Sequence, residues 1–126
     1  MNRAMIVTVL AAYDGADTSS SGGVWYEAGQ RWAVANGISD GTNMEQNLTR
    51  EQLALMLWSY AGKPDARQSL TGYPDMGSVS NWAKQAMAWA VENGLISGVD
   101  GALAPQGEAT RAQVATILMR FVEKAV

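Results

Sequence analysis

The chain contains neither cysteine nor histidine among its 126 residues. Without a thiol or an imidazole, disulfides, thiol nucleophiles, imidazole bases and the usual zinc sites are excluded. Positive charge is also scarce, because nine basic residues stand against twelve acidic residues and leave a net charge of −3. Proteins that bind nucleic acids depend on a positive field, so the composition predicts no nucleic-acid partner. Any anion must be bound by a local site.

Long apolar runs are absent as well. A membrane-spanning helix needs about 20 consecutive apolar residues, and the longest apolar segment, residues 3–12, is much shorter. This segment has the early arginine and short apolar run of a signal peptide, but no clean cleavage site follows it, and its apolar positions match those of two later segments. We therefore predict a helix here and no membrane insertion. An exported parent protein would need a signal upstream of this sequence.

What the sequence does have is internal repetition. The clearest copy begins at Thr110, which can cap a helix while Gln113 completes a capping box. The apolar stripe of this helix consists of Val114, Ile117, Leu118 and Phe121. Thr49 begins a second copy 61 residues earlier, and Asn2 begins a third copy 47 residues before that. Each cap is followed by an arginine, namely Arg3, Arg50 and Arg111, at a helix end that favours anions.

A second kind of segment is also repeated, at a spacing of 57 residues. Trp25 and Trp32 recur as Trp82 and Trp89, and the glycine that ends each segment recurs as well. Repeats of this period predict duplicated supersecondary units. We expect the four tryptophans to pack in the core, while one of each pair could instead border a groove and stack on a sugar.

Together these patterns predict an all-α protein with helices near residues 2–13, 24–36, 49–61, 80–93 and 110–124. The three arginine-bearing helices share an apolar stripe and are expected to pack together. We interpret residues 1–126 as a single domain that holds the last helix of a partial repeat (1–13) and two repeats (24–62 and 73–126). Met1 directly precedes the first helix, which indicates that the sequence starts inside a repeat.

The ordered set of motifs resembles the S-layer homology (SLH) domain. Its T-R-A-E motif matches residues 49–52 and 110–113, its F-x-D element matches Tyr73 and Asp75, its glycine turn matches Gly94 and Gly98, and its F-x-P loop matches Leu103 and Pro105. The resemblance implies a pseudo-threefold spindle of three central helices with helix-loop prongs, of which the first prong is missing here. It also implies an extracellular protein of a bacterial surface, anchored non-covalently to anionic, pyruvylated cell-wall polysaccharide.

Carried over by motif, the ligand arginines of the family fall on Arg3, Arg50 and Arg111. Gly41 and Gly98 would line the grooves, with Asp75, Trp25 and Trp82 nearby. From spacing alone, Arg50 and Arg111 could equally be solvated or paired with Glu51 or Glu108. We expect Arg111 to contribute most to affinity, Arg50 less and Arg3 least, because the repeat that ends in Arg111 has the fullest set of motifs. The glutamine at positions 52 and 113 and the absent first prong leave the number of binding grooves open.

Catalysis is not predicted. Asp40, Glu45 and Glu51 cluster around one loop, but the other repeat has no equivalent pair of carboxylates for glycoside hydrolysis. Asp40 also lacks the neighbours of a calcium loop, so we predict no cofactor and no metal. The alternative function is a structural or dimerisation module without sugar binding, in which a second chain supplies the missing prong and forms a homodimer.

Overall fold

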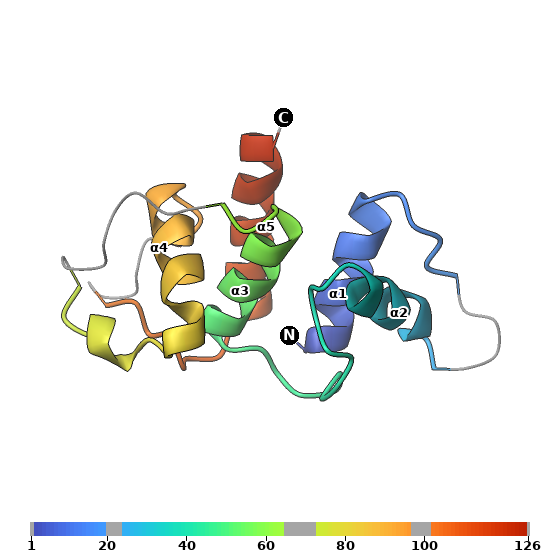
Figure 1. The fold of residues 1–126 in the computed structure, drawn as a ribbon, viewed down its shortest axis with the longest axis horizontal. Helices are drawn as coiled ribbons and strands as arrows, with labels where there is room; N and C mark the ends of the chain where they lie inside the picture. Colours follow the sequence, from blue (N-terminus) through green and yellow to red (C-terminus); the bar gives the residue numbers. More distant parts are fainter. Residues whose placement is uncertain (1, 20–23, 65–72, 97–101, 126) are drawn as a thin grey trace. The chain divides into compact units, whose positions relative to one another are not determined.

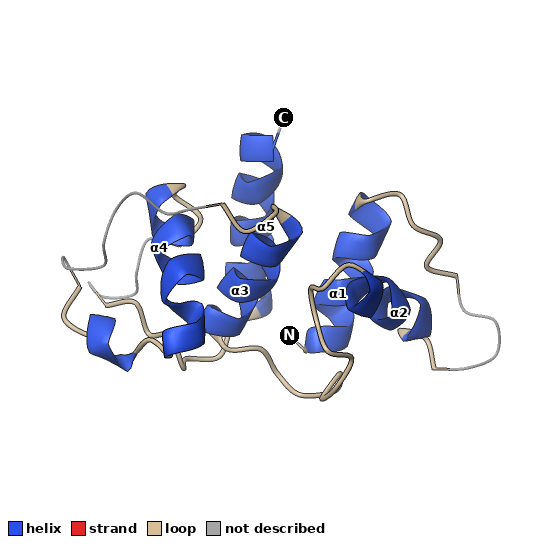
Figure 2. Ribbon diagram, viewed as in Figure 1, coloured by secondary structure: helices blue, strands red, loops and turns tan. Residues whose placement is uncertain are grey.

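The computed structural model describes residues 2–19, 24–64, 73–96 and 102–125. These residues form five α-helices and two short 3-10 helices, with two isolated β-bridges and no strand (Figures 1 and 2). The predicted all-α class is confirmed, whereas the spindle arrangement stays a prediction. Two compact units make up the chain, unit 1 with residues 1–48 and unit 2 with residues 49–126. No helix in the described ranges is long and apolar enough to cross a membrane.

Unit 1 is built from α1 (Arg3–Tyr13) and α2 (Glu27–Ala35). The Asn2 side chain caps α1 by accepting a hydrogen bond from the Met5 N–H at 2.9 Å. The two helices pack closely because α2 carries Gly29 at their contact, where an added Cβ would lie only 2.8 Å from the Thr8 Cα. The apolar side of α1 is therefore covered by α2.

The loop after α2 turns back to the start of α1. Gly37 ends α2 with a φ of +70°, and the Ile38 N–H then donates to the Ala33 carbonyl at 2.8 Å, as in a Schellman end. Further along the loop, Met44 and Leu48 are buried. Residues 38–48 thus belong to unit 1, although in the sequence they lead directly into the next arginine-bearing helix.

Unit 2 contains α3 (Arg50–Tyr60), the 3-10 helices η1 (Met76–Ser78) and η2 (Asn81–Ala83), α4 (Lys84–Glu92) and α5 (Arg111–Ala125). Both predicted capping boxes are confirmed. The Thr49 hydroxyl accepts from the Gln52 N–H at 3.3 Å while the Gln52 side chain accepts from the Thr49 N–H at 3.0 Å. Thr110 and Gln113 exchange the same two bonds at 3.2 and 3.1 Å.

Aromatic contacts join α5 to the ends of α3 and α4. The Phe121 ring centroid lies 5.9 Å from that of Tyr60 and 6.3 Å from that of Trp89. Trp89 is buried, as expected, but Trp25 and Trp82 are each 51% exposed, so the expected core position is wrong for these two. They lie at the exposed starts of the tryptophan segments, before the regular helices begin.

Candidate functional site

The start of α3 is held by the loop that precedes α5. The Arg50 N–H donates to the Gly107 carbonyl at 2.9 Å, and the Glu51 N–H donates to the Pro105 carbonyl at 3.0 Å. The first N–H groups of a helix have no acceptor within the helix, so the loop supplies the acceptors that these two need. Thr49 and Glu108 form an isolated antiparallel bridge beside them. A loop distant in sequence is thus fixed against the arginine-bearing turn.

The Arg50 side chain is enclosed by this loop. Its Nε donates to the Leu103 carbonyl at 3.0 Å, and the residue is only 5% exposed. No carboxylate of the described residues forms an ion pair with it, so both interpretations from spacing, a solvated arginine or a pair with Glu51 or Glu108, are wrong for this position. Burial lowers the pKa of Arg50 from its ordinary value, but a guanidinium remains charged at any pH at which proteins are folded. The site therefore presents a buried positive charge without a compensating carboxylate.

The Glu51 carboxylate binds Ser80 and Gln106 and forms no ion pair with Arg50. Its carboxylate accepts hydrogen bonds from the Ser80 N–H at 2.9 Å, the Ser80 hydroxyl at 2.7 Å and the Gln106 side chain at 3.1 Å. Gln106 also donates to the Ser78 carbonyl at 2.8 Å. This Glu51 clamp joins α3 to the segment before α4 and to the loop before α5, which leaves the neighbouring Arg50 charge unneutralised.

Asp75 fixes the same loop from its other side. Its two carboxylate oxygens accept from the Leu103 N–H at 2.9 Å and the Ala104 N–H at 2.8 Å. These bonds, with that from Leu103 the largest cause, hold the pKa of Asp75 below its usual value. The loop needs such support because Ala104 has a φ of +47°, a left-handed conformation that is costly for a residue other than glycine.

These contacts correct one expectation from the sequence. Asp75 and Pro105 belong to the repeat that ends in Arg111, and we expected them to form the groove beside that arginine. They instead support the start of α3, so these motif residues lie beside Arg50. Each loop contacts the arginine-bearing helix that precedes its tryptophan helix.

Unit 1 repeats this arrangement around Arg3. The Arg3 N–H donates to the Gln46 carbonyl at 3.1 Å and the Ala4 N–H to the Met44 carbonyl at 2.8 Å. The Arg3 Nε, in contrast, is buried without a hydrogen-bond partner among the described residues. Asp40 has a lowered pKa, mainly because its carboxylate accepts from the Thr42 hydroxyl and N–H and in smaller part because of the charge of Arg3.

Gly41, predicted to line a groove, lies in this loop with a φ of +82°, and its carbonyl accepts from the Gln30 side chain at 2.6 Å. A Cβ at Gly41 would lie 3.0 Å from the Val34 side chain, so the loop passes close to α2. Its predicted counterpart, Gly98, lies outside the described residues. Trp25 and Trp82 are exposed, and their part in a groove stays a prediction.

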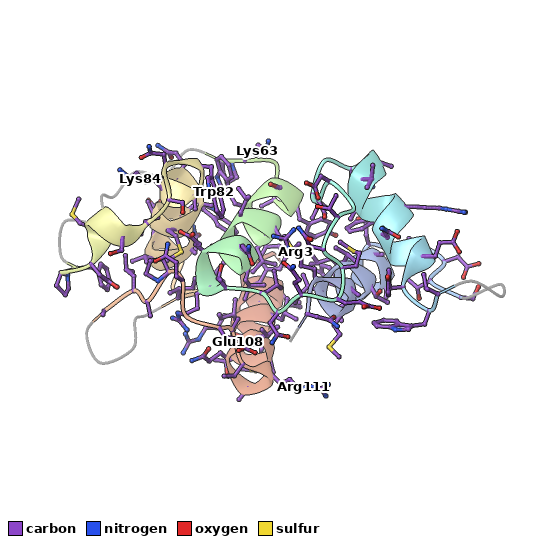
Figure 3. All side chains as sticks on the ribbon, turned by 90° about the horizontal axis from the view of Figure 1, so that it is seen from below. Arg3, Lys63, Trp82, Lys84, Glu108 and Arg111 are labelled. Atoms are coloured by element: carbon purple, nitrogen blue, oxygen red, sulfur yellow. The ribbon has the colours of Figure 1, made fainter. Side chains whose placement is uncertain are left out.

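Arg111 differs from the other two arginines. It is exposed at the first turn of α5, from which its side chain points outward (Figure 3). The structure gives neither the Arg111 N–H nor the Ala112 N–H an acceptor among the described residues. Within the described ranges, loop carbonyls thus accept from the first turns that bear Arg3 and Arg50, and none accepts from the turn that bears Arg111.

Sequence reasoning missed the Glu51 clamp and the carbonyl that binds Arg50. Ser80 and Gln106 are polar residues beside predicted helix starts, which is the only signal that could have drawn attention to them. The Leu103 carbonyl has no signal at all, because every residue has a carbonyl group.

The family model described as the S-layer homology domain matches residues 72–115. The exoglucanase XynX of Acetivibrio thermocellus is 35% identical over 97% of this chain, and the amylopullulanase of Thermoanaerobacterium thermosulfurigenes is 31% identical over 97% of it. Cell surface glycoprotein 1 of Acetivibrio thermocellus is 32% identical over 76% of the chain. The chain spans only 12%, 7% and 4% of these three relatives. No solved structure gives a significant match.

Proposed function

Because this chain belongs to the S-layer homology family through residues 72–115, we propose that it anchors an exported protein non-covalently to a bacterial cell wall. The ligand that we propose is an anionic secondary cell-wall polysaccharide carrying pyruvylated sugars. The family match and the similarity to a cell surface glycoprotein support an extracellular position at the cell wall or surface. The S-layer homology domain is a binding domain rather than a catalytic one. The two enzyme names belong to relatives of which this chain covers a small part.

One observation carries the proposal, namely the state of the Arg50 guanidinium. Only its Nε has a protein acceptor among the described residues, the Leu103 carbonyl at 3.0 Å. The two terminal nitrogen groups have none, and Glu51 is held by Ser80 and Gln106. A desolvated guanidinium forms strong charge-assisted, often bidentate hydrogen bonds with carboxylates and phosphates.

The surroundings of Arg50 favour an anion further. The guanidinium belongs to the first residue of α3, where the positive end of the helix dipole lies. Leu103 and Asp75 fix the loop around it before any ligand arrives, so little ordering would be needed on binding. A pyruvyl carboxylate on a sugar has the charge and the planar geometry that such a site recognises.

Exposed indoles would complete the binding of a polysaccharide. Trp82 in unit 2 and Trp25 in unit 1 are each 51% exposed, which is unusual for so large an apolar side chain. Indole rings combine a broad apolar face with a polar N–H group and suit the apolar face of a sugar ring. We propose that Arg3 and the loop around Gly41 form a second, weaker site of the same kind.

The burial of Arg50 favours one alternative, a structural module that retains the fold without binding sugar. At 5% exposure, the arginine could serve only to hold the Leu103 carbonyl. The two functions predict different behaviour with cell walls, because a purely structural module has no affinity for the polymer.

A pull-down on purified bacterial sacculi separates the two functions. The intact chain is mixed with sacculi before and after chemical removal of the secondary polymer, and the bound fraction is measured. Wall anchoring predicts binding to untreated sacculi and loss of binding after the polymer is removed. Equal recovery from both preparations, or no binding to either, would contradict it.

A further inference from the structure

Two Asn-Gly pairs occur in the sequence, and each pair follows a helix. Asn36 and Gly37 follow α2, and Asn93 and Gly94 follow α4. The other asparagines precede arginine, methionine, leucine or tryptophan. Glycine has no side chain to shield its backbone nitrogen, so an asparagine before glycine is the least hindered toward attack by that nitrogen. The two pairs are therefore the positions at which this chain is most prone to lose a side-chain amide.

Loss of the amide needs only water and the chain itself. The backbone nitrogen of the glycine bonds to Cγ of the asparagine, the Cγ–Nδ2 bond breaks, and the proton of the attacking nitrogen leaves with the side-chain NH₂ group as ammonia. Water then opens the succinimide ring at either carbonyl and gives aspartate or isoaspartate. The net change replaces a neutral amide with a carboxylate, without an oxidant or an enzyme.

The helix ends hold both pairs in the same unreactive geometry. Asn36 and Asn93 each have a ψ of 7°, which turns the nitrogen of the next residue away from the asparagine side chain. Each Nδ2 donates to the carbonyl four residues earlier, at 2.8 Å. The N–H groups of Gly37 and Gly94 donate to carbonyls of the last helical turn at 3.2 and 3.1 Å. Deamidation at either pair thus requires the helix end to open locally.

The end of α4 is held by its surroundings. Asn93 is half-buried, and the two residues after the glycine, Leu95 and Ile96, are 1% and 2% exposed. Arg120 of α5 also donates to the Gly94 carbonyl at 3.3 Å. Opening this end would expose two apolar side chains and break a contact with another helix, so its opening costs much free energy.

The end of α2 is more open to solvent. Its last turn and the glycine, residues 34–37, are exposed throughout. Ile38 after the glycine is 6% exposed, but the next residue is the polar, half-buried Ser39, where unit 2 has the buried Ile96. Opening this end exposes one buried apolar side chain instead of two, so its opening costs less free energy.

We propose that Asn36 is a site of spontaneous deamidation in the folded protein and that Asn93, which also precedes a glycine, is protected. The new carboxylate would lie beside the Trp32 carbonyl, to which the amide had donated, and at the negative end of the helix dipole. Both effects weaken the end of α2, from which residues 38–48 return to the start of α1. The inference concerns covalent change in the chain itself and does not depend on polymer binding.

The test incubates the intact chain at mildly alkaline pH and quantifies the amide of each asparagine by peptide mass spectrometry. Asn36 should lose its amide about tenfold faster than Asn93, because its helix end opens more often. The same chain in denaturant is the matched control, in which the two rates should agree within about a factor of two because no helix end protects either pair.

A pair of variants tests the effect of the modification. Asn36→Asp places the product carboxylate at the end of α2, whereas Asn36→Ser leaves this position neutral. The Ile38 N–H donates to the Ala33 carbonyl at 2.8 Å in the folded end. Its hydrogen exchange should be about three- to fivefold faster in Asn36→Asp than in Asn36→Ser, because a negative charge at a helix C-terminus is unfavourable.

Three results would overturn the proposal. The first is equal loss of amide at Asn36 and Asn93 in the folded chain. The second is an intact Asn36 in the folded chain after a period in which the denatured chain has lost this amide completely. The third is equal Ile38 exchange in Asn36→Asp and Asn36→Ser, which would remove the effect assigned to the modification. No polymer is present in these experiments, so their failure would leave wall binding unaffected.

Discussion

The two units share one backbone arrangement and differ in how its loop is supported. In both, two loop carbonyls accept from the first N–H groups of an arginine-bearing helix. Asn43 in unit 1 and Ala104 in unit 2 occupy equivalent loop positions and have similar positive φ values of 55° and 47°. Residues 43–46 and 104–107 therefore share one backbone conformation, although the segment between glycine stop and arginine is four residues longer in unit 2.

The two loops differ in the side chains that hold them by hydrogen bonds. Arg50 has a carbonyl partner for its Nε, while the Arg3 Nε is buried without one in the described part of the chain. The loop in unit 2 is fixed by Asp75 and Glu51, which bind it across long stretches of sequence. In unit 1 the turn at Asp40 is held by its neighbour Thr42 and by the Gln30 side chain of α2, which donates to the Gly41 carbonyl. A duplicated fold can thus contain one well-ordered site and one less supported copy.

The largest loss of stability is expected at core positions that are equivalent in the two units. Leu10 and Leu57 occupy equivalent positions, and each is 1% exposed. Leu10→Ala and Leu57→Ala should each lower the free energy of unfolding by about 2 to 5 kcal/mol, whereas Leu118→Ala should cost less because Leu118 is only half-buried. Chemical denaturation measures all three. A Leu118→Ala cost above that of Leu57→Ala would contradict this order.

The second largest loss of stability is expected at a contact that only unit 2 contains. Glu51→Ala removes the acceptor of two Ser80 donors and of Gln106, and unit 1 has Ala4 at the equivalent position. Unpaired donors cost about 1 to 3 kcal/mol when they are buried. Because Ser80 is only half-buried and Gln106 is exposed, we expect a loss near the lower end of this range in denaturation experiments. The exposed carboxylate of Glu45 is the control, since surface substitutions usually change stability by less than about 0.5 kcal/mol. Equal losses of stability in Glu51→Ala and Glu45→Ala would show that the hydrogen bonds of Glu51 do not stabilise unit 2.

A smaller effect tests the common backbone path. Ala104→Gly should stabilise unit 2 by up to about 1 kcal/mol, because glycine adopts a positive φ without steric cost. Asn43→Ala should destabilise unit 1 by a similar amount, because asparagine tolerates this conformation better than alanine. Melting temperatures of the two variants measure these changes, and shifts of the same sign would contradict a shared conformation.

The smallest effect is the pH dependence of the loop contacts that Asp75 makes in unit 2. Asp75 has a pKa below the ordinary 3.8 because its ionised form accepts the Leu103 and Ala104 N–H groups. Its contribution to stability is complete above about pH 3.8 and is lost as the pH falls through the lowered pKa. The amide NMR shifts of Leu103 and Ala104 should therefore titrate with a midpoint below 3.8, and Asp75→Asn should abolish this titration. A midpoint at or above 3.8 would show that the carboxylate does not hold the loop.

Local features could be predicted from the sequence. The capping boxes at Thr49 and Thr110 depend on residues three positions apart, and the glycine stops depend on one backbone conformation. The apolar stripes follow from helical periodicity, which is why Leu53, Leu57 and Val114 are buried as expected. These features require no knowledge of which elements meet in space.

The sequence did not predict which loop residues contact the start of α3. Each loop lies between two arginine-bearing helices, and the sequence places Pro105 only six residues before Arg111. The loop contacts α3 through backbone carbonyls. Every type of residue has a carbonyl, so the sequence does not indicate which residues make this contact. The predicted order of the arginines was based on which repeat has the fullest set of motifs, and the contacts of Asp75 and Leu103 place those motif residues beside Arg50.

The central claim, that Arg50 binds the wall polymer, is tested most directly by equilibrium binding of matched variants to purified pyruvylated polymer. Arg50→Gln should weaken binding about ten- to a hundredfold, as expected for the loss of a charge-assisted hydrogen bond of about 1.5 to 3 kcal/mol. Arg50→Lys, which keeps the charge, should retain part of the affinity, and melting temperatures will show whether each variant is folded. Arg111→Ala should bind like the parent chain. Loss of binding in Arg111→Ala, with parental affinity in a folded Arg50→Gln variant, would contradict the account.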